Sequence, residues 1–360
     1  MSPTTMQCVV CYGPHDYRVE RRPVPQPGPG EVLIQIGAAG ICASDMKCYA
    51  GGPLFWGENG TGGYCEAPVI PGHEFAGHIV ALGEGARELH GVDSGDHVIA
   101  EQIIPCHQCR FCRDGHYWMC EPHVIFGFKR QRAEGGWAEF MLFPRNSRIH
   151  KITAGISAEQ AAYIEPLACA VHAVERGNIQ PDDTVVVAGA GNIGLCMLQV
   201  ARLYNPRTLI AVDVKQYRLD LARKLGADIT LNPMTAGAVQ EVKRLTNGYG
   251  ADVYIEAAGH PAAAQQGLEM LRRLGTFVAF SVLNEPATIN WTLVGDQKEL
   301  TIHGSHLGPY CYPKAIDYLA SRKVNVDALI SATFPIAQFP EAMAAARSGN
   351  SLKTLLLPPL

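Results

Sequence analysis

Apolar positions follow two different patterns along the chain, and the change between them falls near residue 150. In the first part, short apolar runs lie between glycine- and proline-rich turns, which predicts short strands of an irregular, mainly antiparallel β domain. These runs occupy residues 32–40, 75–83, 96–100 and 140–143.

From residue 157, helical and strand patterns alternate. One long helix is expected over residues 157–177, and a later helix is expected to end at Leu274. The predicted strands between the helices lie at residues 184–189, 208–213, 252–259, 276–281 and 301–307. Strands that alternate with helices predict a doubly wound, parallel α/β sheet. The last segment is expected to return to the first domain.

A dinucleotide fingerprint lies at the first strand of this second part. Gly189, Gly191 and Gly194 follow a run of valines in G-x-G-x-x-G spacing, and Asp213 ends the next strand. Such glycines allow a tight turn, the approach of a pyrophosphate and close helix packing, while the acid accepts the ribose hydroxyls and repels a 2′-phosphate. The pattern therefore predicts NAD rather than NADP, although the nearby Arg218 leaves NADP as an alternative.

Ligands of open α/β sheets bind at the carboxyl ends of the strands, so the cofactor should contact the residues that follow several strands. The expected cofactor residues are Gly189, Gly191, Asn192, Ile193, Gly194, Asp213, Arg218, Ala258, Ser281, Val282 and Leu283.

Composition limits the possible partners and the compartment. A chain of 360 residues is long enough for about two domains. The net charge of −4 and the absence of a basic run argue against nucleic acid and against a membrane surface as partners. The N-terminal segment lacks the pattern of a signal peptide, so a cytoplasmic protein is expected, and its 12 cysteines are interpreted as thiols or metal ligands.

Four of these cysteines form a compact group. Cys106, Cys109, Cys112 and Cys120 have C-x2-C-x2-C-x7-C spacing. Four thiolates in so short a segment can complete a tetrahedral shell around zinc with no open position, which predicts a structural zinc site. An iron–sulfur cluster is the alternative for closely spaced cysteines.

A second group of candidate ligands is dispersed along the sequence. It comprises Cys42, the adjacent His73 and Glu74, and Glu165. Each residue alone has an ordinary structural explanation. Together they supply the thiolate, imidazole and carboxylate that a catalytic zinc ion uses while a position stays open for substrate.

The chain resembles the zinc-dependent medium-chain dehydrogenases, because several of its motifs occur in the order found in that family. Within the family it resembles the polyol branch, which includes sorbitol, xylitol, threitol and erythritol dehydrogenases. Besides the cysteine group and the fingerprint, the motifs lie at residues 27–32, 42–45, 71–77, 95–98, 135–140 and 165–168. The resemblance implies a Rossmann NAD-binding domain over residues 161–300. It also implies a GroES-like catalytic domain built from residues 1–160 and 301–360.

The resemblance also implies roles for the dispersed residues. Cys42 and His73 match the catalytic zinc ligands, while Glu74 and Glu165 match carboxylates that bind zinc directly or through water. Asp45 would orient the His73 ring. Ser44 would hydrogen-bond the substrate hydroxyl and begin a proton relay. Many relatives have a histidine where this chain has Lys47, so the outer part of that relay stays open.

The expected activity is NAD-dependent oxidation of a secondary hydroxyl of a small polyol, most closely a tetritol such as erythritol or L-threitol, to a ketose. Two zinc ions per chain and a homotetramer or dimer are implied as well. Two alternatives stay open: oxidation of an amino alcohol such as L-threonine, and a non-catalytic NAD-binding sensor.

Overall fold

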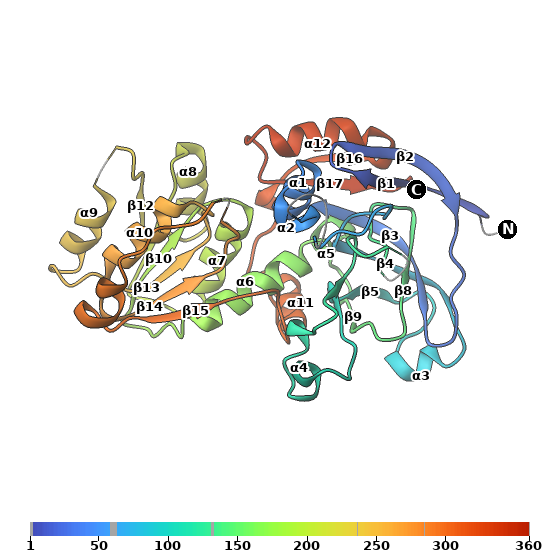
Figure 1. Cartoon of the computed structure of the whole chain (residues 1–360), viewed down its shortest axis with the longest axis horizontal. Coiled ribbons are helices and arrows are strands. Elements are labelled where there is room, and N and C mark those ends of the chain that lie inside the picture. Colours follow the sequence, from blue (N-terminus) through green and yellow to red (C-terminus); the bar gives the residue numbers. More distant parts are fainter. Residues whose placement is uncertain (1–2, 58–62, 131–132, 236, 284, 360) are drawn as a thin grey trace. The chain divides into compact units, whose positions relative to one another are not determined.

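The computed structural model describes residues 3–57, 63–130, 133–235, 237–283 and 285–359. The chain forms two compact units, and Figure 1 labels many of their helices and strands. Unit 1 comprises Met1–Glu165, Ala315–Ala320 and Val326–Leu360, and unit 2 comprises Pro166–Lys314 and Ser321–Asn325.

Unit 1 is built around a seven-stranded sheet in which most neighbours are antiparallel. In sheet order the strands are β16 (Ile330–Pro335), β17 (Lys353–Leu357), β3 (Val32–Ile41), β4 (Glu74–Leu82), β5 (His97–Ala100) and β9 (Ile149–Lys151), with β8 (Phe140–Phe143) paired to β3. The one parallel pair is β16 with β17, which brings the C-terminal segment back to this sheet.

Smaller elements complete unit 1 and cover its apolar core. Two further strand pairs are β1 (Thr5–Gly13) with β2 (Asp16–Pro23), and β6 (Ile103–Ile104) with β7 (Val124–Ile125). The helices of this unit include α1 (Ala43–Tyr49), α2 (Pro53–Trp56), α3 (Ala86–His90), α4 (Arg110–Arg113), α5 (Ala158–Ala161) and α12 (Phe339–Arg347).

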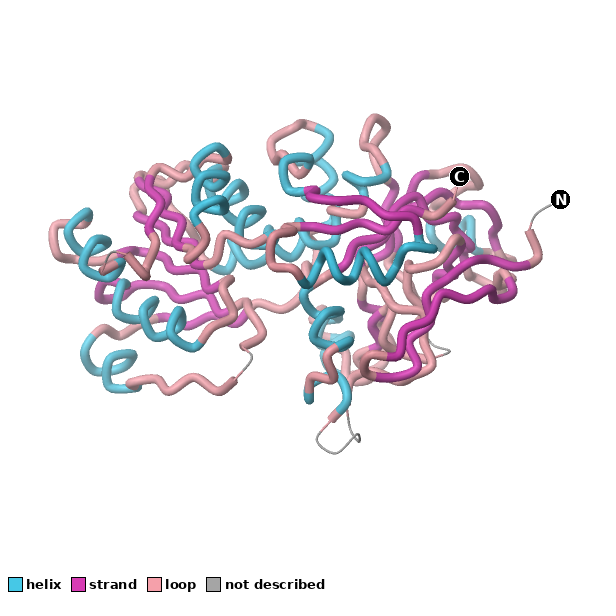
Figure 2. The backbone as a smooth tube through the Cα atoms, turned by 90° about the horizontal axis from the view of Figure 1, so that it is seen from above, coloured by secondary structure: helices cyan, strands magenta, loops and turns pink. Residues whose placement is uncertain are grey.

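Unit 2 contains a six-stranded sheet in which every neighbouring pair is parallel. The order is β12 (Ile229–Leu231), β11 (Thr208–Val212), β10 (Thr184–Ala188), β13 (Ala251–Glu256), β14 (Leu271–Ala279) and β15 (Thr301–Gly304). Figure 2 shows helices on both sides of these strands. They include α7 (Asn192–Arg202), α8 (Gln216–Lys224), α9 (Ala238–Leu245) and α10 (Pro261–Met270), while α6 (Ile164–Arg176) and α11 (Tyr312–Ala320) cross the unit boundaries.

The predicted fold class is confirmed: one unit holds the parallel doubly wound sheet and the other the mainly antiparallel one. The two units divide differently from the ranges expected from sequence. Residues 301–314 belong to unit 2 because β15 pairs with β14 and extends the parallel sheet. No helix in the described part of the chain is long and apolar enough to cross a membrane.

Two predicted helices have different bounds in the structure. The expected helix over 157–177 is two helices, α5 and α6, because Pro166 lacks an N–H and would clash with the carbonyl of a preceding turn, so it lies in the first turn of a new helix. The helix expected to end at Leu274 ends at Met270. There the Lys298 ammonium binds the carbonyls of Leu268 and Glu269 and takes the place of further helical donors.

Two positions of the loop between β10 and α7 require glycine, one because of its backbone angle and one because of a close backbone contact. Gly189 has a φ of +94°, which side chains rarely adopt. A Cβ atom on Gly194 would lie 1.7 Å from the Gly189 carbonyl oxygen, so only glycine lets the first turn of α7 approach the loop. The spacing of the fingerprint thus follows from backbone contact as well as from ligand chemistry.

We predict that Gly194→Ala lowers the free energy of unfolding by about 1–3 kcal/mol, because the clash forces the turn to shift. Gly295→Ala is the matched control, since nothing lies within 4 Å of a Cβ atom at that position. Urea unfolding followed by circular dichroism measures both variants. Equal stability of the two variants would contradict the packing role of Gly194.

Candidate active site and metal centres

The start of helix α1 brings three predicted site residues together. Strand β3 ends at Ile41, and Cys42 is the N-cap of α1. The Asp45 carboxylate accepts a hydrogen bond from the Cys42 backbone N–H at 2.9 Å, which closes the first turn. One local motif therefore fixes the Cys42 thiol, the Ser44 hydroxyl and the Asp45 carboxylate around a single helical turn.

His73 and Glu74 reach the same place from the start of β4. Asp45 Oδ1 lies 3.4 Å from His73 Nδ1, a distance typical of an ion pair rather than of a good hydrogen bond. Ser44 Oγ lies 3.4 Å from the other ring nitrogen, Nε2. Burial alone lowers the pKa of His73, but the Asp45 carboxylate and the Cys42 thiol outweigh it, so this pKa is raised well above its ordinary value.

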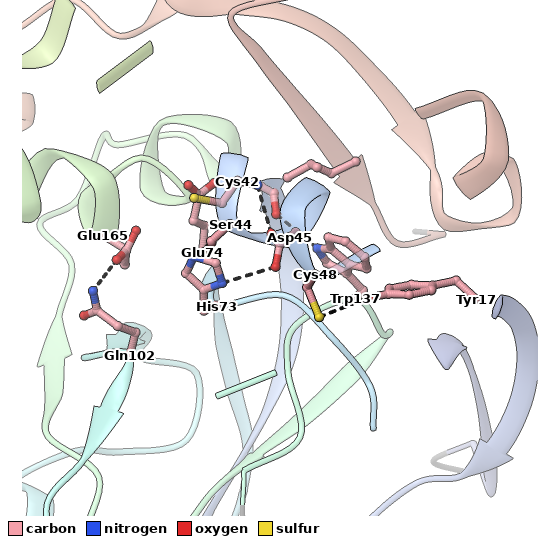
Figure 3. Close-up of polar contacts among 12 residues, drawn as sticks. Tyr17, Cys42, Ser44, Asp45, Cys48, His73, Glu74, Gln102, Trp137 and Glu165 are labelled. Carbon is pink, nitrogen blue, oxygen red and sulfur yellow. Dashed lines mark hydrogen bonds and ion pairs between the residues drawn. The ribbon is translucent and has the colours of Figure 1, made fainter. Parts of the chain in front are cut away.

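The ligand atoms of Cys42, His73 and Glu74 all lie within 4.8 Å of one another, and the latter two residues are buried. Figure 3 shows these side chains gathered beside Ser44 and Asp45. A thiolate, an imidazole and a carboxylate form a donor set that suits zinc. The buried atoms His73 Nδ1 and Asp45 Oδ1 have no hydrogen-bond partner among the described residues but face each other at 3.4 Å, which leaves the other ring nitrogen, Nε2, for the ligand set.

The four cysteines of the loop after β6 also converge. The sulfur atoms of Cys106, Cys109, Cys112 and Cys120 lie within 4.8 Å of one another. The backbone N–H groups of Gln108 and Cys109 point at the Cys106 sulfur from 3.4 and 3.3 Å. These hydrogen bonds lower the pKa of Cys106 to about 6, which favours the thiolate that zinc requires. This group forms the structural zinc site.

A buried lysine beside the catalytic group was not anticipated from the sequence. Lys353 Nζ binds both Glu74 carboxylate oxygens, Oε1 at 2.6 Å, and lies 3.5 Å from the Ile41 carbonyl oxygen. Lys353 and Glu74 are only 2% and 1% exposed. Burial lowers the pKa of Lys353, but Glu74 outweighs it and raises this pKa, so the pair is ionic. The sequence gives one indication of this lysine: it lies just before the apolar run 355–357, where a charged residue is unusual.

Glu165 lies outside the group formed by Cys42, His73 and Glu74. It is 4% exposed, in the first turn of α6, and its Oε1 accepts a hydrogen bond from Gln102 Nε2. Gln102 is a second residue that the sequence analysis missed, because a glutamine after a buried strand carries no chemical signature of its own.

In unit 2 the predicted cofactor residues surround the carboxyl ends of the parallel strands. Asp213, after β11, accepts the Ala190 N–H of the glycine loop and the Lys215 N–H, each at 2.8 Å. Arg218 Nη1 lies 3.7 Å from the same carboxylate.

The other predicted cofactor residues of unit 2 fall into two groups. Gly191, Asn192, Ile193 and Gly194 form the start of α7. The remaining residues follow later strands: Ala258 donates its N–H to Glu256 Oε1 at 2.8 Å, and Ser281, Val282 and Leu283 follow β14.

Comparison with known proteins agrees with this geometry. Residues 28–154 match the alcohol dehydrogenase GroES-like domain, and residues 192–321 match the zinc-binding dehydrogenase family model. The chain is 47% identical over 357 residues to the erythritol/L-threitol dehydrogenase of Mycolicibacterium smegmatis, covering 99% of this chain and 98% of the relative. The chain belongs to the zinc-binding dehydrogenases.

Two further known proteins show how far the similarity extends. The sorbitol dehydrogenase of Halalkalibacterium halodurans is 33% identical, with 96% of this chain and 97% of the relative covered. The crystal structure of a short chain alcohol dehydrogenase from Escherichia coli CFT073, complexed with NADH, superposes with a TM-score of 0.86 at 28% identity. The alignment covers 99% of this chain and 100% of that one.

We predict that Lys353→Met destabilises the metal-free dehydrogenase by about 3–5 kcal/mol, because it leaves the buried Glu74 carboxylate without its cation. Urea unfolding of the metal-free and zinc-loaded protein measures the effect, which should be smaller with zinc bound. The double variant Glu74→Gln/Lys353→Met is the control, since removing both charges should recover part of the loss. If the double variant is no more stable than the single one, the unpaired charge is not the cause.

Proposed function

We propose that the protein oxidises a secondary hydroxyl of a small polyol, a tetritol such as erythritol or L-threitol, to the corresponding ketose with NAD as hydride acceptor. The observation that carries the proposal is the convergence of Cys42 with the buried His73 and Glu74 beside Ser44, in a chain 47% identical along 99% of its length to an erythritol/L-threitol dehydrogenase. The 33% identity to a sorbitol dehydrogenase supports a polyol rather than a simple alcohol.

The residues of unit 1 have distinct tasks in this reaction. Cys42, His73 and Glu74 would hold the catalytic zinc, which when bound supplies a Lewis acid that lowers the pKa of an alcohol hydroxyl. Asp45 faces His73 Nδ1 and fixes the ring so that Nε2 is the nitrogen directed at the ligand group. Ser44 Oγ, 3.4 Å from that nitrogen, is placed to accept the hydroxyl proton and pass it outward.

The residues of unit 2 would bind the cofactor, which supplies the hydride chemistry. The Gly189–Gly194 loop and the N-terminus of α7 would hold the pyrophosphate. Asp213, fixed by two backbone N–H groups, would accept the ribose hydroxyls and repel a 2′-phosphate, while Arg218 beside it limits that repulsion. Ala258 and the Ser281–Leu283 segment would lie toward the nicotinamide.

We further propose that the enzyme works as a homo-oligomer, a dimer or tetramer, in the cytoplasm. The family resemblance supports the assembly, and the reduced thiols of the metal groups suit a reducing compartment. Size-exclusion chromatography with light scattering tests the assembly directly.

Turnover on a defined panel tests the activity. The purified protein should reduce NAD with tetritols faster than with three-, five- or six-carbon polyols, secondary alcohols or L-threonine. It should contain two zinc ions per chain, and Cys42→Ala should lose turnover and one zinc ion, because the catalytic group loses a ligand. Cys8→Ala, a buried thiol of β1 outside both groups, is the control. No turnover with any alcohol, despite bound zinc and NAD, would favour the sensor alternative.

Cofactor choice is tested at Asp213. Asp213→Ser should reduce the preference for NAD over NADP, measured as the ratio of kcat/KM values, by about tenfold or more, because it removes charge-assisted hydrogen bonds and the repulsion of a phosphate. An unchanged ratio would remove the proposed role of this carboxylate.

A further inference from the structure

A cavity of about 440 Å³ lies in unit 1, where the end of helix α3, the four-cysteine loop and the turn between β8 and β9 come together. Its lining includes two arginines and three histidines: Arg145, Arg148, His90, His107 and His150. No aspartate or glutamate of the described residues lines it. The lining contains none of the zinc ligands and none of the predicted cofactor residues, so this cavity is distinct from both sites.

Two of the lining side chains are fixed by one buried carboxylate. Glu101 is 1% exposed and lies 3.0 Å from both Arg148 Nε and His150 Nε2. The Arg148 guanidinium also lies 4.2 Å from the centre of the Tyr117 ring. The backbone beneath them is regular, because β9 pairs with β5 and the Glu101 N–H donates to the Arg148 carbonyl at 2.9 Å. This wall of the cavity is therefore preorganised.

Arg145 brings positive charge to the cavity without a carboxylate partner. The residue is exposed, and its guanidinium forms no ion pair with any residue that the structure describes. Its side chain packs on Gly30, since a Cβ atom there would lie 2.8 Å from Arg145 Cγ and 3.0 Å from Nη1. His90 Nε2 lies 3.0 Å from the Gly30 carbonyl oxygen. Arg145 and His90 therefore lie against the same glycine.

The turn between β8 and β9 also places a buried hydroxyl at the cavity. The Ser147 N–H donates to the Pro144 carbonyl at 2.9 Å, which closes the turn. Ser147 is 6% exposed and lines the cavity, and its Oγ has no hydrogen-bond partner among the described residues. A buried hydroxyl without a partner is costly, so an acceptor bound at this place would satisfy it.

This combination of groups suits a phosphate monoester. A guanidinium binds phosphate oxygens through two parallel N–H donors, and a phosphate monoester carries about two negative charges near neutral pH. A volume of about 440 Å³ falls within the range of small-molecule sites, so it also has room for an organic group. The net charge of −4 on the chain argues against an extended polyanion such as nucleic acid.

We propose that this cavity binds a small phosphorylated metabolite, a phosphate monoester, with the Arg145 guanidinium and the Ser147 hydroxyl as donors to the phosphate and Arg148 and His150 as the wall beside it. The site goes beyond the proposed dehydrogenase activity and does not depend on it. Binding is best measured with zinc present, because His107 directly follows the zinc ligand Cys106.

Isothermal titration calorimetry of the zinc-loaded, full-length protein tests the proposal. The protein is saturated with NADH, which occupies the other place where a phosphate group would bind. Ribose 5-phosphate should bind, while ribose, which lacks only the phosphate, should not. Arg145→Met keeps an unbranched chain beside Gly30 and should weaken binding by about tenfold or more, because it removes charge-assisted hydrogen bonds. Arg145→Lys keeps the charge without the planar fork, so its loss should be smaller.

Matched variants separate the site from general effects of charge. Arg273→Met removes an exposed arginine of β14 in unit 2 and should leave binding unchanged. Arg145→Met should keep the turnover and the melting temperature of the unmodified protein, because Arg145 is exposed and lies outside the catalytic group. Ser147→Ala should weaken binding as well, since it removes the second donor.

Three outcomes would overturn the proposal. The first is no binding of ribose 5-phosphate, or binding that Arg145→Met leaves unchanged. The second is equally tight binding of inorganic phosphate, which would mean that the organic group is not recognised. The third is equally tight, Arg145-dependent binding of citrate, which would assign the cavity to polycarboxylates. None of these results bears on polyol turnover, which the alcohol panel tests separately.

Discussion

Burial of negative charge is the constraint on which unit 1 depends. Asp45 and Glu74 are nearly inaccessible to water close to the paired ends of β3 and β4, and Glu165, in the first turn of α6, is also buried. A buried carboxylate without a partner costs several kcal/mol, so each must face a donor. The partners come from separate parts of the chain: Asp45 accepts the Cys42 N–H and faces His73, Lys353 binds Glu74, and Gln102 donates to Glu165. β17, β3 and β4 are neighbours in the sheet, and their ends meet here. The order of these strands therefore brings Lys353, at the start of β17, next to Glu74, at the start of β4.

Space around these charges is provided by glycine. A Cβ atom on Gly40 would lie 1.9 Å from Glu74 Oε2, so the strand opposite the carboxylate cannot carry a side chain there. Gly72, with a φ of +97°, turns the chain into His73 and packs against the Trp137 ring. The Trp137 indole N–H in turn donates to the Gly40 carbonyl at 3.0 Å. Two glycines and one tryptophan thus fix the path of the backbone that delivers His73 and Glu74.

The sequence was informative where the chemistry is local. The glycine fingerprint and the four cysteines each lie within one short segment, so their spacing predicts which residues come together. The roles of Ser44 and Asp45, which share one helical turn with Cys42, were implied by the family resemblance and not by spacing. The fold class followed from the same kind of information, because strand and helix periods are local. Lys353 and Gln102 could not be placed in this way, since their partners are 279 and 63 residues distant and only the sheet brings them together. The end of the parallel sheet was also missed, because the pairing of β15 with β14 is a tertiary contact.

Three carboxylates are held in three different ways, and each way determines what the group can do next. Glu74 is held by an ammonium, so its charge is already shared when a metal ion arrives, and binding the metal must compete with Lys353. Asp213 is held by two backbone N–H groups, one of them in the glycine loop, so its position and the shape of the loop depend on each other. The Gln102 amide donates a hydrogen bond to one carboxylate oxygen of Glu165. The same functional group is therefore held beside a cation, by backbone N–H groups or by an amide, and its electrostatic surroundings differ accordingly.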